Sequence, residues 1–514
     1  MDKYRLNRQH ILGASLLYMA LPCILFILGW VRLWLAVPVT LALVLGIVLL
    51  IRKGFGVQEE RRYCTFGNKG MVSLVCTLLL MLLVTEMISF HGHVIQSCDF
   101  LVRNAIYESL QRDAWPLISN RGEYFVYYHA YWLPPALICK CFNLSAHADT
   151  VIFCWTYLGL MLVGLILFTR LKERVLLFSI ILLLSGNVIE ILKAFQMVAA
   201  ARVDALPWLN DYLATMEHLA VRCYVRYVHW WGQIANTFNH AVTMSIVMAL
   251  LLTKLLPVRY IPLFAALGVY CSPLASFALL PVLLIVYFFR RGVIKTWLLS
   301  PCTWLGCVLV VIMAAYLSCQ MSQEGGSSVV TLLSDYSYWS HKHGDFELLY
   351  VRLLRYALVV VGFVLQIYIV VSHRFRRNLW YYSMLVLLAL LPFIWIGRAH
   401  NEFLFKGSIV VFFIYSWLIA LQWKHASVAR RCLITLVVLL SSLHVVLDVQ
   451  RRKFNEFSFN PAVMESHKLL GWQGHLNHPG DYDYTNFWCE MKYPALFYSK
   501  PGELWECLRE NKPY

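Results

Sequence analysis

A carboxylate and a cation four residues apart mark the first place in the sequence where chemistry is expected. Asp99 and Arg103 would share one face of a helix if the segment between them is helical. Two interpretations remain open: a surface ion pair or helix cap, or a general base held beside a cation at the membrane surface. The spacing alone favours the first, structural interpretation.

An aromatic stretch follows. Residues 122–140 read GEYFVYYHAYWLPPALICK, and six of the nineteen are Tyr, Phe or Trp. Such rings prefer the headgroup level of a bilayer, while Pro134 and Pro135 prevent a full span, so we expect a short helix over 133–140. The stretch is either an anchor for a loop or a wall for a lipid-linked sugar. The candidate wall residues are Tyr127, Tyr128, His129 and Trp132.

Polar side chains also gather later in the chain. Arg226 precedes the sixth predicted span and His240 lies inside it, where a histidine usually faces protein or a polar cavity. Lys406 falls at the start of a span and needs an anion there, either Glu402 or a ligand phosphate. The second cluster, GRAHNEFLFKGS, contributes Arg398, Asn401, Glu402 and Lys406.

No cofactor motif accompanies these residues. The sequence has no Walker loop and no GxGxxG after a strand, so a nucleotide is not expected. The tail motif HLNHPGDYD could bind a metal, but its Pro-Gly pair is more typical of a solvated turn. A divalent metal is therefore conceivable and not indicated, and none of the candidate site residues is assigned to one.

The elements that must position these residues are apolar helices. Of the 514 residues, 60% are hydrophobic and 14% charged, far from a soluble protein's balance. We predict an all-α polytopic membrane protein with about thirteen spans, and with small helices in its outer loops. The spans are 11–30, 33–51, 71–90, 150–169, 174–192, 234–253, 260–272, 274–289, 297–317, 351–371, 379–396, 403–422 and 432–448.

The region 260–289 is too long for one upright span, and its halves are too short to cross singly. Ser272 and Pro273 mark its middle, and basic residues flank both ends. We expect a short broken pair of helices that returns to the same side.

Charge predicts the orientation. With the N-terminus inside, the inner segments carry 22 of the 44 Lys and Arg residues and only four acids, which leaves +18 inside and −2 outside. The basic balance therefore reflects topology and gives no reason to expect nucleic acid as a partner. We predict one transmembrane unit, 1–448, and an extracytoplasmic tail. The larger outer segments are 91–149, 193–233, 318–350 and the tail 449–514.

The order of these motifs resembles a known family. After Asp99 come RN, WP and YYHAYWLPPALICK, then NHAVTMSIVMALLL, CSPLASFALLPVLL and GRAHNEFLFKGSIVVFF. Over roughly 95–425, this succession is similar to largely uncharacterised bacterial membrane proteins of the GT-C glycosyltransferase type. Glu402 stands where that group often has Asp, Lys406 stands for Arg, and the usual Pro-Gln before His240 is missing. No DxD-like acidic pair lies near Asp99, which counts against a metal-dependent mechanism.

The resemblance implies a GT-C-like fold in the bacterial inner membrane, with the chemistry on the extracytoplasmic face. It implies transfer of a sugar from a polyprenyl-phosphate donor to an envelope glycan or lipid acceptor, with Asp99 as the base and inversion at the anomeric carbon. We expect Arg398, Lys406 and Arg226 to hold the phosphate. Arg103, His240, Asn401 and Glu402 are further candidates for binding the donor. Two alternatives stay open: a flippase or transporter of lipid-linked oligosaccharide, and an O-antigen polymerase or ligase.

Overall fold

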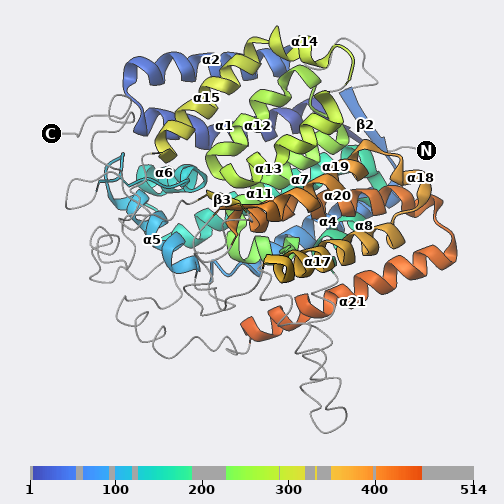
Figure 1. Cartoon of the computed structure of the whole chain (residues 1–514). Helices are drawn as coiled ribbons and strands as arrows, with labels where there is room; N and C mark the ends of the chain where they lie inside the picture. Colours follow the sequence, from blue (N-terminus) through green and yellow to red (C-terminus); the bar gives the residue numbers. More distant parts are fainter. Residues whose placement is uncertain are drawn as a thin grey trace.

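A computed structural model describes residues 4–53, 62–91, 99–118, 125–187, 227–288, 290–318, 330–332, 349–396 and 401–453. These parts are mostly helical. Figure 1 shows α5 and α6 at one end of the helix assembly, and β2 and α18 at the opposite end. The prediction of a largely helical protein is confirmed for the described residues.

Seven helical segments among the described residues are long and apolar enough to cross a membrane. They are Arg8–Trp30, Leu33–Arg52, Asn68–Glu86, Ser145–Leu184, Trp230–Thr253, Pro301–Ser318 and Glu402–His425. Shorter apolar segments are Val258–Cys271, Pro273–Phe288, Tyr356–Val370 and Leu379–Phe393. Together with α21 (Val428–Lys453), these segments fall at the positions of the predicted spans. Length and composition support a protein embedded in a membrane.

The N-terminal region consists of three long helices and a small sheet. Asn7 caps the first helix by accepting hydrogen bonds from the backbone amides of Gln9 and His10. The elements are β1 (Tyr4–Asn7), α1 (Arg8–Trp30), α2 (Leu33–Lys53), β2 (Tyr63–Phe66) and α4 (Asn68–Glu86). Strands β1 and β2 pair antiparallel, with Tyr4 opposite Phe66.

The first large predicted outer segment contains two helices. The predicted helix over 133–140 is confirmed as α6, whose two prolines lie in the first turn, where no helical amide bond is lost. The elements are α5 (Asp99–Arg112), a 3-10 turn at Ala130–Trp132 and α6 (Leu133–Phe142). Then come 3-10 turns at Ser145–His147 and Lys172–Arg174 that flank α7 (Ala148–Leu171), and α8 (Val175–Leu184).

The predicted broken pair is present as a helical hairpin. Its first arm is α12 (Ile261–Cys271), preceded by a 3-10 turn at Val258–Tyr260. Its second arm is α13 (Pro273–Leu283), continued by a π-helical turn at Leu284–Phe288. Between the arms Ser272 leaves helical geometry, with φ −149° and ψ 67°.

Both ends of this hairpin lie beside the C-terminal end of α11 (Trp230–Thr253). The Tyr287 hydroxyl donates to the Leu251 carbonyl at 3.4 Å, and the Tyr287 and Trp297 rings are 6.5 Å apart. The Trp297 indole in turn donates to the Val258 carbonyl at 2.9 Å. The arms therefore start and end together, as the sequence predicts. We call residues 254–259, 287–288 and 290–297 the hairpin base, and Cys271, Ser272 and Pro273 the hairpin tip.

The C-terminal half completes the bundle with further helices. They are α14 (Val293–Leu298), α15 (Pro301–Ser318), α17 (Leu349–Val370), α18 (His373–Arg376), α19 (Leu379–Leu390) and α20 (Glu402–Gln422). A 3-10 turn at Trp423–His425 connects α20 to α21.

The predicted span 379–396 is wrong at its end. The helix α19 ends at Leu390, a 3-10 turn covers Leu391–Phe393, and β4 (Ile394–Ile396) pairs antiparallel with β3 (Val330–Leu332). Pro392 explains the change, because it has no amide hydrogen for the Leu388 carbonyl. The Tyr227 hydroxyl bonds that carbonyl instead.

The helices divide into a centre and a rim. In the most apolar windows of α11 and α20, 94% and 89% of the residues are buried, against 28% in α2 and 33% in α15. Leu33 and Leu41 of α2 are 60% and 64% exposed, a pattern suited to contact with lipid. Polar residues on α11 and α20 are therefore held inside the protein.

Candidate functional site

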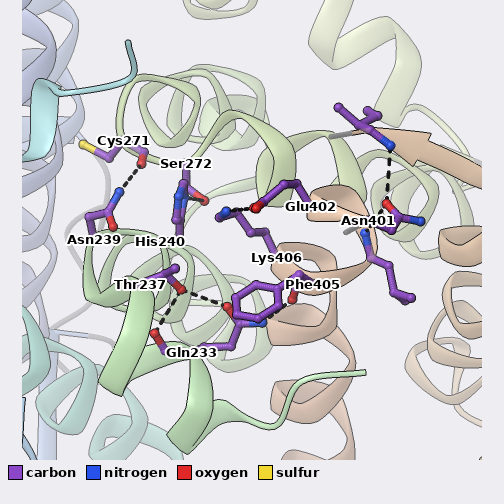
Figure 2. A network of polar contacts seen from close by, with 12 residues as sticks. Gln233, Thr237, Asn239, His240, Cys271, Ser272, Asn401, Glu402, Phe405 and Lys406 are labelled. Atoms are coloured by element: carbon purple, nitrogen blue, oxygen red, sulfur yellow. Dashed lines mark hydrogen bonds and ion pairs between the residues drawn. The ribbon is translucent and has the colours of Figure 1, made fainter. Parts of the chain in front are cut away.

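Polar side chains from five parts of the chain meet near the N-terminal ends of α11 and α20. The contributing parts are α5, the aromatic segment 125–132, the first half of α11, the hairpin tip and the first turn of α20. Figure 2 shows the residues of the last three together. We call this group the polar cluster. It consists of Arg103, Tyr127, Tyr128, His240, Ser272, Glu402 and Lys406.

Lys406 and Glu402 form an ion pair across one turn of α20. The Lys406 side chain is 4% exposed and that of Glu402 is 28% exposed, so the ammonium is the more deeply buried partner. A buried ammonium without an anion would be costly. Of the two anions expected from the sequence, the structure contains the carboxylate at i−4. The phosphate alternative is untested.

The hairpin tip meets the middle of α11 at two adjacent residues. The Nδ1 atom of His240 lies 3.0 Å from the Ser272 hydroxyl, and the Asn239 amide donates to the Cys271 carbonyl at 3.3 Å. A helix break leaves carbonyl groups without their intrahelical donors, so α11 supplies partners at the break. This contact positions His240 in the polar cluster.

Arg103 approaches the same place from α5. That helix begins at Asp99, so Asp99 and Arg103 are four residues apart in one continuous helix. Arg103 is buried, and its guanidinium lies 5.6 Å from the centre of the Phe100 ring. His240 is within electrostatic reach of both Arg103 and Lys406. Two cations from distant segments therefore act on one imidazole.

Tyr127 and Tyr128 cover this group from the aromatic segment. Their rings stack at 4.0 Å, and the Tyr128 ring lies 5.0 Å from that of His240. Burial raises the pKa of the Tyr127 hydroxyl well above its ordinary value, with a further rise from Tyr128, while the charges of Arg103 and Lys406 lower it. The same two cations thus reach both His240 and Tyr127.

α11 is bent where it enters the cluster. Thr237 has φ −137° and ψ 50°, and its hydroxyl donates to the Gln233 carbonyl at 3.0 Å. The Gln233 amide bonds the Phe405 carbonyl of α20. This bond joins the two central helices one residue before Lys406, as Figure 2 shows.

His129 and Trp132 lie in a packing layer behind the two tyrosines. His129 is fully buried, its ring is 4.5 Å from Trp30 and 5.8 Å from Phe125, and neither ring nitrogen has a hydrogen-bond partner among the described residues. Burial lowers the pKa of His129 to about 3. Trp132 packs on Phe238 at 5.9 Å. Both residues support the segment from behind.

Asn401 stabilises the start of α20 through two side-chain hydrogen bonds. Its side-chain oxygen accepts a hydrogen bond from the Leu404 amide at 3.1 Å, and its side-chain nitrogen donates to the Ile394 carbonyl at 3.0 Å. It thereby caps α20 and ties that helix to β4. This cap fixes the first turn of α20, from which Glu402 and Lys406 project.

Glu108 on α5 was not among the sequence candidates. Burial raises its pKa to about 7, Arg112 lowers it and Asp113 raises it. A carboxyl group near neutrality is suited to proton transfer. Five residues of helix separate Glu108 from Arg103, which puts the two on different faces. The sequence signal, Glu108 four residues before Arg112, indicates only an ion pair.

Three predicted site residues lie outside the described residues. These are Arg226, Arg398 and the side chain of Asp99, whose backbone alone is described. The same holds for most of the segments 193–233 and 318–350 and for the tail beyond 453.

Comparison of the chain with protein-family models, with curated proteins and with solved structures found no match. Within the described residues, no group of three His, Cys, Asp or Glu side chains could hold a metal ion. Two cations, an imidazole, a serine hydroxyl and stacked tyrosine rings can bind an anionic group next to a ring-shaped polar one.

Proposed function

We propose that the protein is a membrane glycosyltransferase with a GT-C-like architecture. It moves a sugar from a polyprenyl-phosphate donor to an envelope glycan or lipid acceptor. One observation carries the proposal: Arg103 and Lys406, from segments far apart in the chain, are both within electrostatic reach of His240 and Tyr127, and the Tyr128 ring lies 5.0 Å from that of His240 and 4.0 Å from that of Tyr127. Cationic side chains bind a phosphate through charge-assisted hydrogen bonds, and tyrosine rings offer an apolar face and a hydroxyl group to a sugar.

The roles follow from the chemistry of the donor. Lys406 and Arg103 bind the phosphate, and Tyr127 and Tyr128 line the sugar position. The acceptor hydroxyl oxygen attacks the anomeric carbon while the bond from that carbon to the phosphate oxygen breaks. The bond electrons leave with the polyprenyl phosphate, and the proton passes to Asp99. Attack opposite the leaving group inverts the configuration, and no nucleotide is required.

Glu402 keeps Lys406 in position before the donor arrives. The ion pair satisfies the ammonium, and its carboxylate is the more exposed partner. A donor phosphate can replace that carboxylate without leaving a buried charge alone. The exchange favours a phosphate-bearing ligand over a neutral one.

In this proposal the site faces the extracytoplasmic side of a bacterial inner membrane, with the N-terminus in the cytoplasm and the tail 449–514 outside. The charge distribution of the sequence supports this orientation. The apolar rim helices support embedding in lipid.

The test compares envelope glycans and lipid-linked sugars by mass in a deletion strain complemented with three forms of the gene. Wild type should restore one sugar residue, and Asp99→Asn should not, although the protein is present in the membrane. Glu108→Gln, on the same helix, is the matched control and should restore the sugar. Restoration by Asp99→Asn would sink the assignment of Asp99, and failure of Glu108→Gln alone would move the base to Glu108.

The broken hairpin favours one other function, transport of a lipid-linked oligosaccharide, because transporters use discontinuous helices near the middle of the membrane. Purified protein in vesicles separates the two. A transferase splits the donor and yields free polyprenyl phosphate, whereas a transporter moves the intact donor between leaflets.

A further inference from the structure

The hairpin base carries a group of cations at the end of the molecule opposite the polar cluster. All five are exposed. They lie at the end of α11, before the first arm, and in the turn and short helix that follow the second arm. They are Lys254, Arg259, Arg290, Arg291 and Lys295.

Hydrogen bonds and ring contacts bring these separate segments together. Tyr287 bonds the end of α11 through the Leu251 carbonyl, and the Arg290 guanidinium lies 5.1 Å from the centre of the Tyr287 ring. Ser300, just before α15, donates to the Arg259 carbonyl at 3.3 Å. The cations therefore form one patch on a fixed scaffold. Figure 1 shows α14, which carries Lys295, at the edge of the molecule.

The segments that carry these cations, and their neighbours along the chain, contain no acidic residues. Residues 218–323 contain no Asp or Glu, and neither do residues 348–401. Ion pairs between described residues include His91 with Glu86 and Lys406 with Glu402. None of the five cations takes part in either.

Other arginines at the same end of the helices bond to backbone carbonyls. Arg174 donates to the carbonyls of Ala420 and Leu421 at 3.0 and 3.1 Å, and Arg430 donates to that of Val370 at 3.2 Å. Among the described residues, no side chain of the five donates such a bond. Their donors are available to a ligand.

Exposed apolar side chains border the patch. Leu298 and Leu299 are 56% and 71% exposed, and Trp304 is 59% exposed with its indole nitrogen bonded to the Leu298 carbonyl. Cations beside an exposed tryptophan and leucines are typical of a surface at the headgroup level.

We propose that the hairpin base is a binding site for an anionic phospholipid. The lipid phosphate bonds Arg259, Arg291 and Lys295, and the acyl chains lie along Leu298, Leu299 and Trp304. Guanidinium groups bind phosphate with two parallel hydrogen bonds, and the charge discriminates against zwitterionic lipids. This inference goes beyond the transferase proposal and does not depend on it.

The test is native mass spectrometry of the full chain in a neutral detergent, titrated with phosphatidylglycerol or with phosphatidylcholine of the same acyl chains. Wild type should prefer phosphatidylglycerol by at least about tenfold. The triple variant Arg259→Gln, Arg291→Gln and Lys295→Gln should lose roughly a hundredfold in that affinity, since each cation near an anionic surface contributes roughly fivefold.

A matched variant removes the same charge elsewhere at this end of the helices: Lys69→Gln, Arg170→Gln and Lys172→Gln. All three side chains are exposed, and Glu173 lies beside two of them. This control should bind phosphatidylglycerol like wild type. A second variant, Arg259→Lys with Arg291→Lys, keeps the charge but loses the paired hydrogen bonds of the guanidinium groups. Its affinity should lie between those of wild type and of the triple variant, which separates lost binding from lost folding.

Three results would overturn the proposal. They are equal binding of the two lipids by wild type, an equal loss in both triple variants, and displacement of the lipid by excess inorganic phosphate. The last would indicate a site for a soluble anion. Transfer activity is measured separately, so its absence would not affect the outcome.

Discussion

The two ends of the hairpin formed by α12 and α13 differ in how their polar groups are satisfied. At the tip, Ser272 and the Cys271 carbonyl are buried and find partners on α11. At the base, five exposed cations form no ion pair in the part of the chain that the structure describes, and one of them, Arg290, lies 5.1 Å from the centre of the Tyr287 ring. The tip is satisfied by protein, and the base is left for a ligand from outside.

In the two proposals, the broken helix keeps two ligands apart within one fold. A buried polar group must be bonded within the protein or by a specific ligand, because the low dielectric makes an unpaired group costly. An exposed cation has no such penalty, because water solvates it until a lipid headgroup binds. We therefore expect changes at the tip to affect transfer, and changes at the base to affect lipid binding.

Loss of the Lys406 ammonium should give the largest effect. Lys406→Met should reduce transfer by roughly 100-fold or more, since a cation on the leaving phosphate is removed. It should also destabilise the fold by about 1 kcal/mol, because the partly exposed Glu402 carboxylate loses its hydrogen-bond partner. Assays of transfer and of thermal unfolding in detergent measure the two effects.

The double variant Glu402→Gln with Lys406→Met is the control for this prediction. It should regain much of the stability and none of the transfer. Phosphatidylglycerol binding should stay at the wild-type level in both variants. Transfer within a few-fold of wild type in Lys406→Met would remove the proposed distinction between the polar cluster and the hairpin base.

Two glycines offer a second way to separate the ends. A methyl group on Gly306 of α15 would lie 3.1 Å from backbone atoms of Pro262 and Leu263 in the first arm. On Gly407 of α20 it would lie 2.5 Å from the Leu391 side chain and 3.0 Å from the Cβ atom of Ala278 in the second arm. Each change to alanine should destabilise the protein by about 1–3 kcal/mol, as overpacking generally does.

The two glycine variants should differ in function, since Gly306 packs on the first arm near the base and Gly407 follows Lys406. Gly306→Ala should weaken lipid binding more than transfer, and Gly407→Ala should do the reverse. Native mass spectrometry and a transfer assay on the same preparations compare them. Equal losses of both functions in both variants would show that the hairpin responds as one unit.

The smallest expected effect is a dependence on pH at the aromatic segment. The pKa of His129 is about 3 in the folded protein, below the ordinary value of 6.5, so the unfolded chain binds the proton more readily. Stability should therefore fall as the pH drops below about 6.5, by about 2 kcal/mol at pH 5. Thermal unfolding of wild type and of His129→Phe measures this.

His129→Phe keeps a ring in the cage of Trp30 and Phe125 and should reduce this pH dependence. Lipid binding at the base should change little over the same range, because guanidinium groups remain charged. An unchanged slope in His129→Phe would place the titrating group elsewhere.

Parts of this arrangement could be predicted from the sequence because their signals are local. Ser272 and Pro273, between two short apolar runs with basic flanks, predict the hairpin. Glu402 four residues before Lys406 predicts the ion pair.

Other parts depend on packing that no local signal encodes. Ser272 and His240 are 32 residues apart, and their contact exists only because the tip rests on α11. The aromatic stretch predicts His129 as part of one wall with Tyr127 and Tyr128, because the sequence does not show which rings face inward. Pro392 indicates the end of α19, but the apolar residues around Pro392 favour a continuous span.

α15 connects the two ends that the hairpin separates. Ser300, at its start, bonds the Arg259 carbonyl, and the Tyr316 hydroxyl near its end accepts from the Tyr127 amide and donates to the Phe125 carbonyl. Its 18 residues span about 27 Å, close to the thickness of a hydrocarbon core of about 30 Å. The helix therefore sets the distance between a lipid surface and the aromatic segment. A bilayer of different thickness would change the tilt of α15 and shift Tyr127 relative to α11. The chain length of the membrane's fatty acids would then affect the positions of the side chains in the polar cluster.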